Sequence, residues 1–156
     1  MGFQVFEVAE LTIDVQERCR HLLQNSLIDL GLPKSAVDDL VLAVGELLSN
    51  VTRYQEKKTV ACEAKIPTCS VGPNIVLVVL TGINYCEPPQ QIPNFNLGED
   101  KERYGGYGLF LVKQLVDAYK PLPKGKGLYL IKSWDSAGPD CKSGRVFYFS
   151  KINFCF

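Results

Sequence analysis

The stretch from residue 36 to residue 54 constrains the fold more than any other part of this chain. Its apolar residues recur every three or four positions, which is the spacing of one broad stripe along an α-helix, and Glu46, Asn50 and Arg53 fall on the opposite side. The stripe consists of Val37, Leu40, Val41, Val44, Leu47, Leu48 and Val51. A helix with a single apolar stripe has to bury it against another layer, so we expect one helical layer packed on one face of a sheet.

The remaining segments supply that sheet and two more helices. Helices are expected over about 14–30 and 107–119, where apolar residues again follow helical spacing. Short apolar runs predict strands over residues 2–8, 59–66, 74–81, 128–134 and 145–152, the last two as a hairpin. We therefore expect an α+β two-layer sandwich, with a mixed, mostly antiparallel sheet of about five strands and the helices on one face. No repeat or boundary is evident, so residues 1–156 are expected to form a single domain.

Charge and composition exclude several classes of function. Lys+Arg and Asp+Glu both number 17, so no basic field favours nucleic acid. No apolar run reaches the roughly 20 residues needed to cross a bilayer. Residues 1–11 show no cationic region before an apolar stretch, so a secretory signal is not expected. We therefore expect a cytoplasmic protein that contacts neither nucleic acid directly nor a membrane.

The six cysteines invite a metal or disulfide interpretation. No two of them have C-x-x-C spacing, and His21 is the one histidine of the chain, so the usual spacing of a zinc site is absent. Free thiols in a reducing compartment are the better interpretation.

Glu46 and Asn50 lie one helical turn apart, and two interpretations of the pair are open. They can belong to the solvated side of an amphipathic helix, or to the floor of a ligand pocket. Leu42 and Gly45 favour the pocket, because Leu42 puts apolar surface on the polar side and Gly45 costs about 1 kcal/mol of helix propensity. In a pocket, the glutamate can act as a general base, and the asparagine oxygen is a hard ligand suited to Mg²⁺.

A cluster of glycines, Gly105, Gly106 and Gly108, comes just before the apolar run of the third helix. Glycine-rich turns often serve only geometry, but the free N–H groups at a helix N-terminus also bind phosphate. The preceding connection, residues 82–105, is rich in glycine and proline and carries Lys101 and Arg103. Such a long connection in a small domain is typical of a functional lid, which we expect to be most mobile over residues 86–104 without ligand.

Together these segments resemble the GHKL-type, histidine-kinase-like ATPase domain, and within it the small bacterial anti-sigma-factor serine/threonine kinases. The N-box of that family, apolar-A-x-x-E-x-x-x-N-x-x-basic, is met by Leu42, Ala43, Glu46, Asn50 and Arg53. Its second glycine box, G-G-x-G-L-F-L, matches GGYGLFL at 105–111. The resemblance extends from about residue 8 to residue 119.

The resemblance implies a role for each matching residue. Asn50 would coordinate Mg²⁺, and Glu46 would be the catalytic base that acts on a protein hydroxyl. ATP would be bound by Asn50, Arg53, Gly82, Arg103, Gly105, Gly106, Gly108 and Leu109. The partner would be a sigma factor or an anti-sigma antagonist, and a homodimer is an option, because members of the family often pair.

The chain departs from the family in the first glycine box, D-x-G-x-G, which falls on residues 80–84 and keeps only Gly82. Leu80 replaces the carboxylate that accepts from the adenine amino group, so we expect weak ATP binding with poor selectivity, improved by Leu80→Asp. The alternative function is a pseudokinase that binds a protein partner without nucleotide. A histidine relay is disfavoured, because the chain has no dimerisation helix and its histidine lies in the first helix.

Overall fold

The computed structural model describes residues 2–67, 74–91 and 104–135 of the chain. Three helices and five strands are assigned within these ranges. In chain order they are β1 (Gly2–Val8), α1 (Ile13–Asp29), α2 (Lys34–Tyr54), β2 (Val60–Lys65), β3 (Asn74–Thr81), α3 (Tyr104–Leu115), β4 (Ala118–Pro121) and β5 (Gly127–Trp134).

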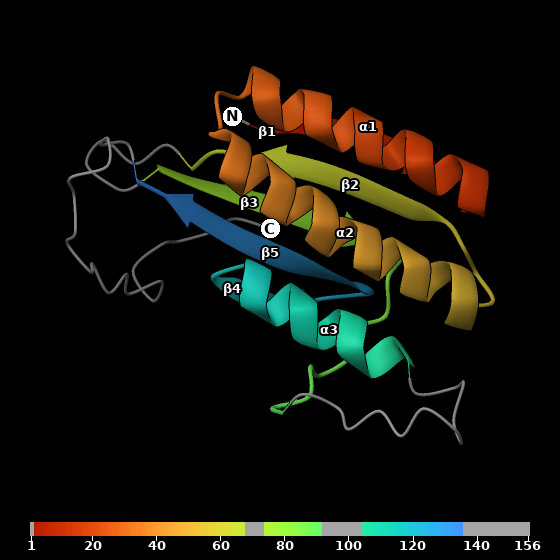
Figure 1. Ribbon diagram of the computed structural model, residues 1–156. Coiled ribbons are helices and arrows are strands. Elements are labelled where there is room, and N and C mark those ends of the chain that lie inside the picture. The colour runs from red at the N-terminus through yellow and green to blue at the C-terminus, as the bar shows by residue number, and fades with distance from the viewer. Residues whose placement is uncertain (1, 68–73, 92–103, 136–156) are drawn as a thin grey trace.

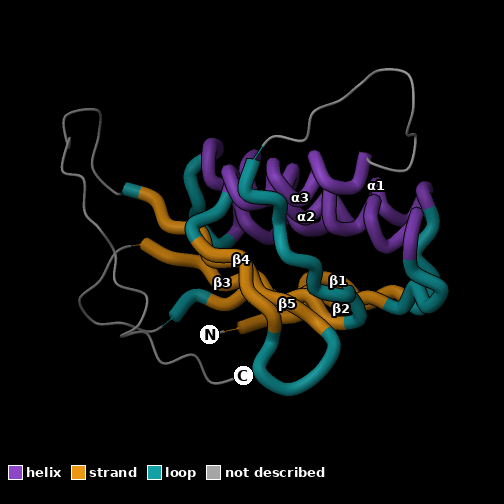
Figure 2. Tube along the Cα trace, turned by 90° about the horizontal axis from the view of Figure 1, so that it is seen from below, coloured by secondary structure: helices purple, strands orange, loops and turns teal. Residues whose placement is uncertain are grey.

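The described strands form one sheet in the order β1-β2-β3-β5-β4, and every neighbouring pair is antiparallel. Figure 1 shows α1, α2 and α3 side by side over the same face of this sheet, and Figure 2 shows the two layers edge-on. The predicted α+β sandwich with its helices on one face is therefore confirmed. The predicted strand at 145–152, and the hairpin that it would close, lie outside the described residues.

The core between the layers follows from strand alternation. Phe6, Cys62, Leu80 and Leu128 occupy matching positions on β1, β2, β3 and β5 and are all buried under the helices. On the central strand β3, Ile75, Leu77 and Val79 alternate with these core positions and form a second buried cluster with Ile131. Burial on both faces explains why residues 74–81 read as an unbroken apolar run.

The groove between α1 and α2 gives Gly45 a different role from the expected pocket floor. A Cβ at Gly45 would lie 2.7 Å from Nε of Arg20 on α1. The glycine therefore makes room for the Arg20 guanidinium, and the interpretation of Gly45 as part of a ligand pocket was wrong. One turn further along, the side chain of Gln16 donates to Ser49 Oγ at 3.1 Å and links the same two helices.

The third helix is placed earlier than predicted, at 104–115 instead of 107–119, and its glycines belong to its first turns. The residues beyond it form β4, which the sequence did not reveal. Asp117 N donates to Ile131 O at 2.8 Å, and Ala118 then pairs with Ile131 in the sheet. Pairing with β5 therefore ends the helix at Leu115, although residues 116–119 continue its apolar spacing.

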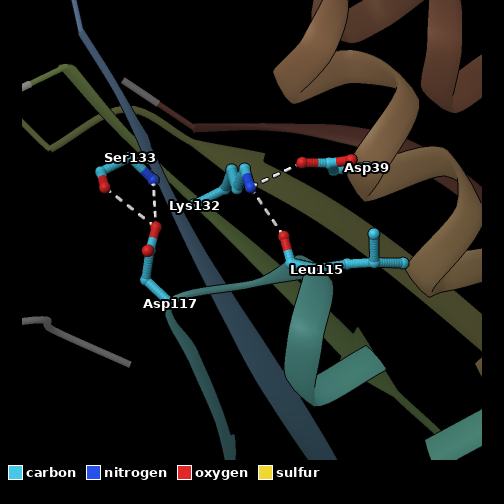
Figure 3. A network of polar contacts seen from close by, with 5 residues as sticks. All are labelled: Asp39, Leu115, Asp117, Lys132 and Ser133. Atoms are coloured by element: carbon cyan, nitrogen blue, oxygen red, sulfur yellow. Dashed lines mark hydrogen bonds and ion pairs between the residues drawn. The ribbon is translucent and has the colours of Figure 1, made fainter. Parts of the chain in front are cut away.

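A polar network holds this helix end in place (Figure 3). Lys132 Nζ on β5 donates to the Leu115 carbonyl and to Asp39 Oδ2 on α2, both at 2.7 Å. Asp117 accepts from Ser133, at 2.6 Å from its backbone N and 2.9 Å from its Oγ. A cation at a helix C-terminus satisfies free carbonyls and interacts favourably with the helix dipole, so Lys132 fastens α3 to α2 and to the sheet.

Two further findings bear on the sequence expectations. Among the helices described, none is long and apolar enough to span a membrane. Cys19, Cys62 and Cys86 carry free thiols, the first two buried and the third exposed. Burial raises the pKa of the thiols of Cys19 and Cys62, so both stay protonated at neutral pH.

Candidate nucleotide site

The α2–α3 contact brings together the two sequence motifs. Glu46 points from α2 toward the backbone of α3, and a Cβ at Gly108 would lie only 2.7 Å from Glu46 Oε2. Any larger residue at position 108 would displace this carboxylate. Gly108 therefore lies inside α3, where it allows the Glu46 carboxylate to approach the helix backbone. It does not belong to a turn that precedes the helix, as the sequence suggested.

A cavity of about 270 Å³ lies beside this contact. Asn50 from α2 and Leu109 from α3 both line it, one turn from Glu46 and next to Gly108 respectively. Its other lining residues are Leu47, Tyr54, Gln55, Ile83, Asn84 and Cys86. Ligand pockets typically measure about 300–1,000 Å³, so this cavity can hold part of a nucleotide. The rest of the nucleotide would extend past the first turn of α3.

The first turn of α3 is suited to anions. The first N–H groups of a helix have no partner within the helix, and α3 begins at Tyr104, so the N–H groups of residues 104–106 are among them. Gly105 and Gly106 among them carry no Cβ that would keep a phosphate away from the backbone. Arg103, expected to add a cation here, lies outside the described residues, as does Lys101.

The turn after β3 forms the wall of the cavity that faces α2. Gly82 has φ +79°, and a Cβ there would lie 1.9 Å from the Thr59 carbonyl oxygen. Leu80, two residues before it, is fully buried in the core and is not among the residues that line the cavity. The side chain of Leu80 therefore faces the core and not this cavity. Thr81 is exposed on the opposite face, as strand alternation requires.

The sequence comparison decides the family. The model of the histidine kinase-like ATPase domain matches residues 9–132, which is most of the chain and includes both α2 and α3. The chain belongs to this family.

Other comparisons add less. The crystal structure of the RsbU and RsbW domains of Rv1364c from Mycobacterium tuberculosis is similar, with 16% sequence identity and a TM-score of 0.49. The match covers 82% of this chain and 31% of that chain, so this chain spans about a third of that protein's length. No curated protein matches the chain.

Not all the predicted site residues of this histidine kinase-like domain meet in one place. Glu46, Asn50, Gly108 and Leu109 come together around the α2–α3 contact. Arg53 is exposed and does not line the 270 Å³ cavity. Gly82 lines a different cavity.

That second cavity is larger, about 630 Å³, and it adjoins the first, because Tyr54, Gln55 and Asn84 line both. It opens on the sheet face away from the helices, where Glu7, Ala61 and Thr81 are paired across β1, β2 and β3. Neither Glu46 nor Asn50 lines it. Size alone would therefore select the wrong place for the chemistry of this family, and the smaller cavity is the candidate nucleotide site.

Several residues of the candidate site were not singled out from the sequence: Tyr54, Gln55, Ile83, Cys86, and Tyr119 behind them. Gln55 lies two residues after Arg53, the last residue of the matched N-box, so only its polarity at a helix end could have drawn attention to it. Tyr119 was assigned to a helix, which hid its contact with the turn after β3. Its hydroxyl donates to the Cys86 carbonyl at 3.1 Å, and its ring centroid lies 4.9 Å from that of Tyr85. Burial raises the pKa of both hydroxyls, so they remain donors at neutral pH.

Proposed function

We propose that this histidine kinase-like domain binds a magnesium nucleotide in the cavity between α2 and α3 and regulates a protein partner, in the manner of anti-sigma-factor serine kinases. The observation that carries the proposal is the placement of Glu46 and Asn50 on α2 against Gly108 and Leu109 on α3. The partner is of the sigma-factor or anti-sigma-antagonist type and is met in the cytoplasm, where residues 1–156 act as a single domain.

The donor groups fit a Mg²⁺ ion that arrives with the nucleotide. No group of three or more His, Cys, Asp or Glu side chains among the described residues could hold a metal by itself. Mg²⁺ usually takes one or two protein oxygens and completes its octahedron with phosphate and water. The carboxamide of Asn50 supplies such an oxygen, and the bound ion would neutralise charge on the phosphates.

The protein groups divide the work of phosphoryl transfer. The N–H groups of the first turn of α3 would hold phosphate oxygens, and Asn50 would supply an oxygen ligand to the ion. Glu46, beside Gly108, would accept the proton of a partner's serine hydroxyl as that oxygen bonds to the terminal phosphorus atom and the bond from this phosphorus to the leaving ADP oxygen breaks. Leucine at position 80 offers no acceptor for an adenine amino group, so affinity is low and ATP and GTP are poorly distinguished.

Leu80 also supports the second candidate function, a pseudokinase that binds its partner without nucleotide. In that case the fold and the partner surface are kept, while the base-recognising carboxylate has been lost. Titration calorimetry with Mg-ATP and Mg-GTP separates the two candidates, because only the first predicts binding.

Two variants test the assigned roles. Asn50→Ala should weaken Mg-nucleotide binding at least tenfold by removing a metal ligand, whereas Asn25→Ala on the exposed side of α1 should not. Glu46→Ala should spare binding but abolish Mg-ATP turnover, for which Glu10→Ala is the control. Equal nucleotide affinity in wild type and Asn50→Ala would exclude the metal role, and turnover retained in Glu46→Ala would exclude the base.

A further inference from the structure

Gln55, the first residue after α2, makes more hydrogen bonds through its side chain than any other residue that lines the candidate site, as far as the structure describes the chain. Its Nε2 donates to the carbonyls of Gly82 at 2.9 Å and Lys57 at 3.1 Å. Its Oε1 accepts from the backbone N–H of Asn84 at 2.9 Å. One carboxamide thus joins the C-terminal end of α2 to both sides of the turn after β3.

The same turn is held at a second point from the opposite side. Tyr119 of β4 donates to the Cys86 carbonyl and stacks against Tyr85. The turn is therefore attached at two places: Gln55 binds the backbone of Gly82 and Asn84, and Tyr119 binds the backbone of Cys86. Ile83, Asn84 and Cys86, which line the candidate nucleotide site, thus lie on a turn that both side chains hold, together with the hydrogen bond from Gly82 N to Lys126 O at 3.2 Å.

We propose that Gln55 is a positioning residue for nucleotide binding, because it holds the turn at residues 82–86 in the conformation that walls the cavity. This proposal rests on the proposed function. It adds which side chain holds the end of the cavity next to β3 in place. With leucine at position 80, the polar side chains beside that end are Asn84 and Gln55 themselves. A carboxamide both donates and accepts, so Asn84 suits either class of purine base.

The chemistry of the carboxamide makes the proposal specific. Glutamate at position 55 would keep an acceptor for Asn84 N–H but would set a carboxylate oxygen against the carbonyls of Gly82 and Lys57. Alanine would remove all three bonds. Since Gln55 is only partly buried, water can replace the lost partners, so the expected result is a looser turn and not an unfolded protein.

The experiment uses the full chain with Gln55→Ala and Gln55→Glu, and Gln114→Ala at an exposed position of α3 as the matched control. The first measurement is amide hydrogen exchange of Asn84 without ligand, and the second is the Kd for Mg-ATP and Mg-GTP by calorimetry. Gln55→Ala should speed Asn84 exchange about five- to tenfold and raise both Kd values by a similar factor, since only the fraction of molecules with a formed turn binds.

Each outcome has one meaning. Gln55→Glu should fall between wild type and Gln55→Ala in both measurements, and Gln114→Ala should match wild type. Unchanged Asn84 exchange in Gln55→Ala would show that Gln55 does not hold the turn. Faster exchange with unchanged Kd would show that the turn does not set affinity. A wild type that binds neither nucleotide would overturn the proposed function and, with it, the role in binding, while the exchange measurement in free protein would still decide whether Gln55 holds the turn.

Discussion

At the scale of single residues, two glycines in this domain are set by neighbouring atoms and not by a need for flexibility. Gly108 leaves space for the Glu46 carboxylate, and Gly82 leaves space for the Thr59 carbonyl. Gly82 also has a positive φ, which costs an L-residue about 1–2 kcal/mol. The two constraints at Gly82 can be separated, because Gly31 has a similar φ of +86° with nothing within 4 Å of a Cβ.

Gly31→Ala should therefore cost only the conformational strain, about 1–2 kcal/mol of the free energy of unfolding. Gly82→Ala should cost about 2–5 kcal/mol, because the backbone clash at Thr59 adds to the same strain. Urea unfolding of both variants measures the difference. Equal losses would mean that the strands relax around the added methyl group at no cost.

At the scale of elements, Lys132 decides how α3 meets α2 and the sheet. Its side chain is 17% exposed and satisfies both a carboxylate on α2 and the last carbonyl of α3. The α2–α3 contact also lies beside the candidate site, so this network holds α3 against the helix that carries Glu46 and Asn50. A comparable Lys–Asp pair, Lys34 with Asp38, lies on the surface with the lysine 87% exposed and can serve as the reference.

Lys132→Met should destabilise the domain by about 1–3 kcal/mol, because Asp39 and the Leu115 carbonyl both lose a charged donor in a partly buried place. Lys34→Met should change stability by at most about 0.5 kcal/mol, as is usual for exposed ion pairs. Chemical denaturation measures both. If the two variants lose the same free energy, the network contributes no more to the packing of α3 than a surface pair does.

At the scale of the whole molecule, β3 serves the core and the candidate site at once. Leu80 is part of the core under the helices, while the turn that starts two residues later walls the cavity. The family pattern alone predicts that Leu80→Asp raises ATP affinity. The structure adds that this substitution places a carboxylate in the core, fully buried opposite Cys62 on β2 and Leu128 on β5.

We therefore expect Leu80→Asp to destabilise the domain by about 3–5 kcal/mol. A gain in ATP affinity can then be measured only on the fraction of the variant that stays folded. Thr81→Asp, on the exposed face next to it, is the control and should stay within about 1 kcal/mol of wild type. Thermal unfolding with and without Mg-ATP tests this. A Leu80→Asp protein as stable as wild type, with tighter ATP binding, would show that position 80 faces the ligand.

The sequence by itself determined the layers and the core of the candidate site. Periodic burial is encoded locally, so the stripe of α2, the doubly buried β3 and the order of elements as far as α3 could be read directly. The spacing of Glu46 and Asn50 and the glycines of α3 likewise followed from the chain, and the structure brings Glu46 and Asn50 together with Gly108.

Only the tertiary structure decided the features that depend on a distant partner. Residues 116–119 were predicted to be helical, but pairing with β5 places Ala118 and Tyr119 in the strand β4. Gly45 proved to make room for Arg20 and not for a ligand. Gln55 and Tyr119 gained their roles from contacts with the turn after β3, 27 and 33 residues away along the chain. Such contacts produce no periodic pattern in the sequence, because each depends on a single pair of groups that the fold brings together.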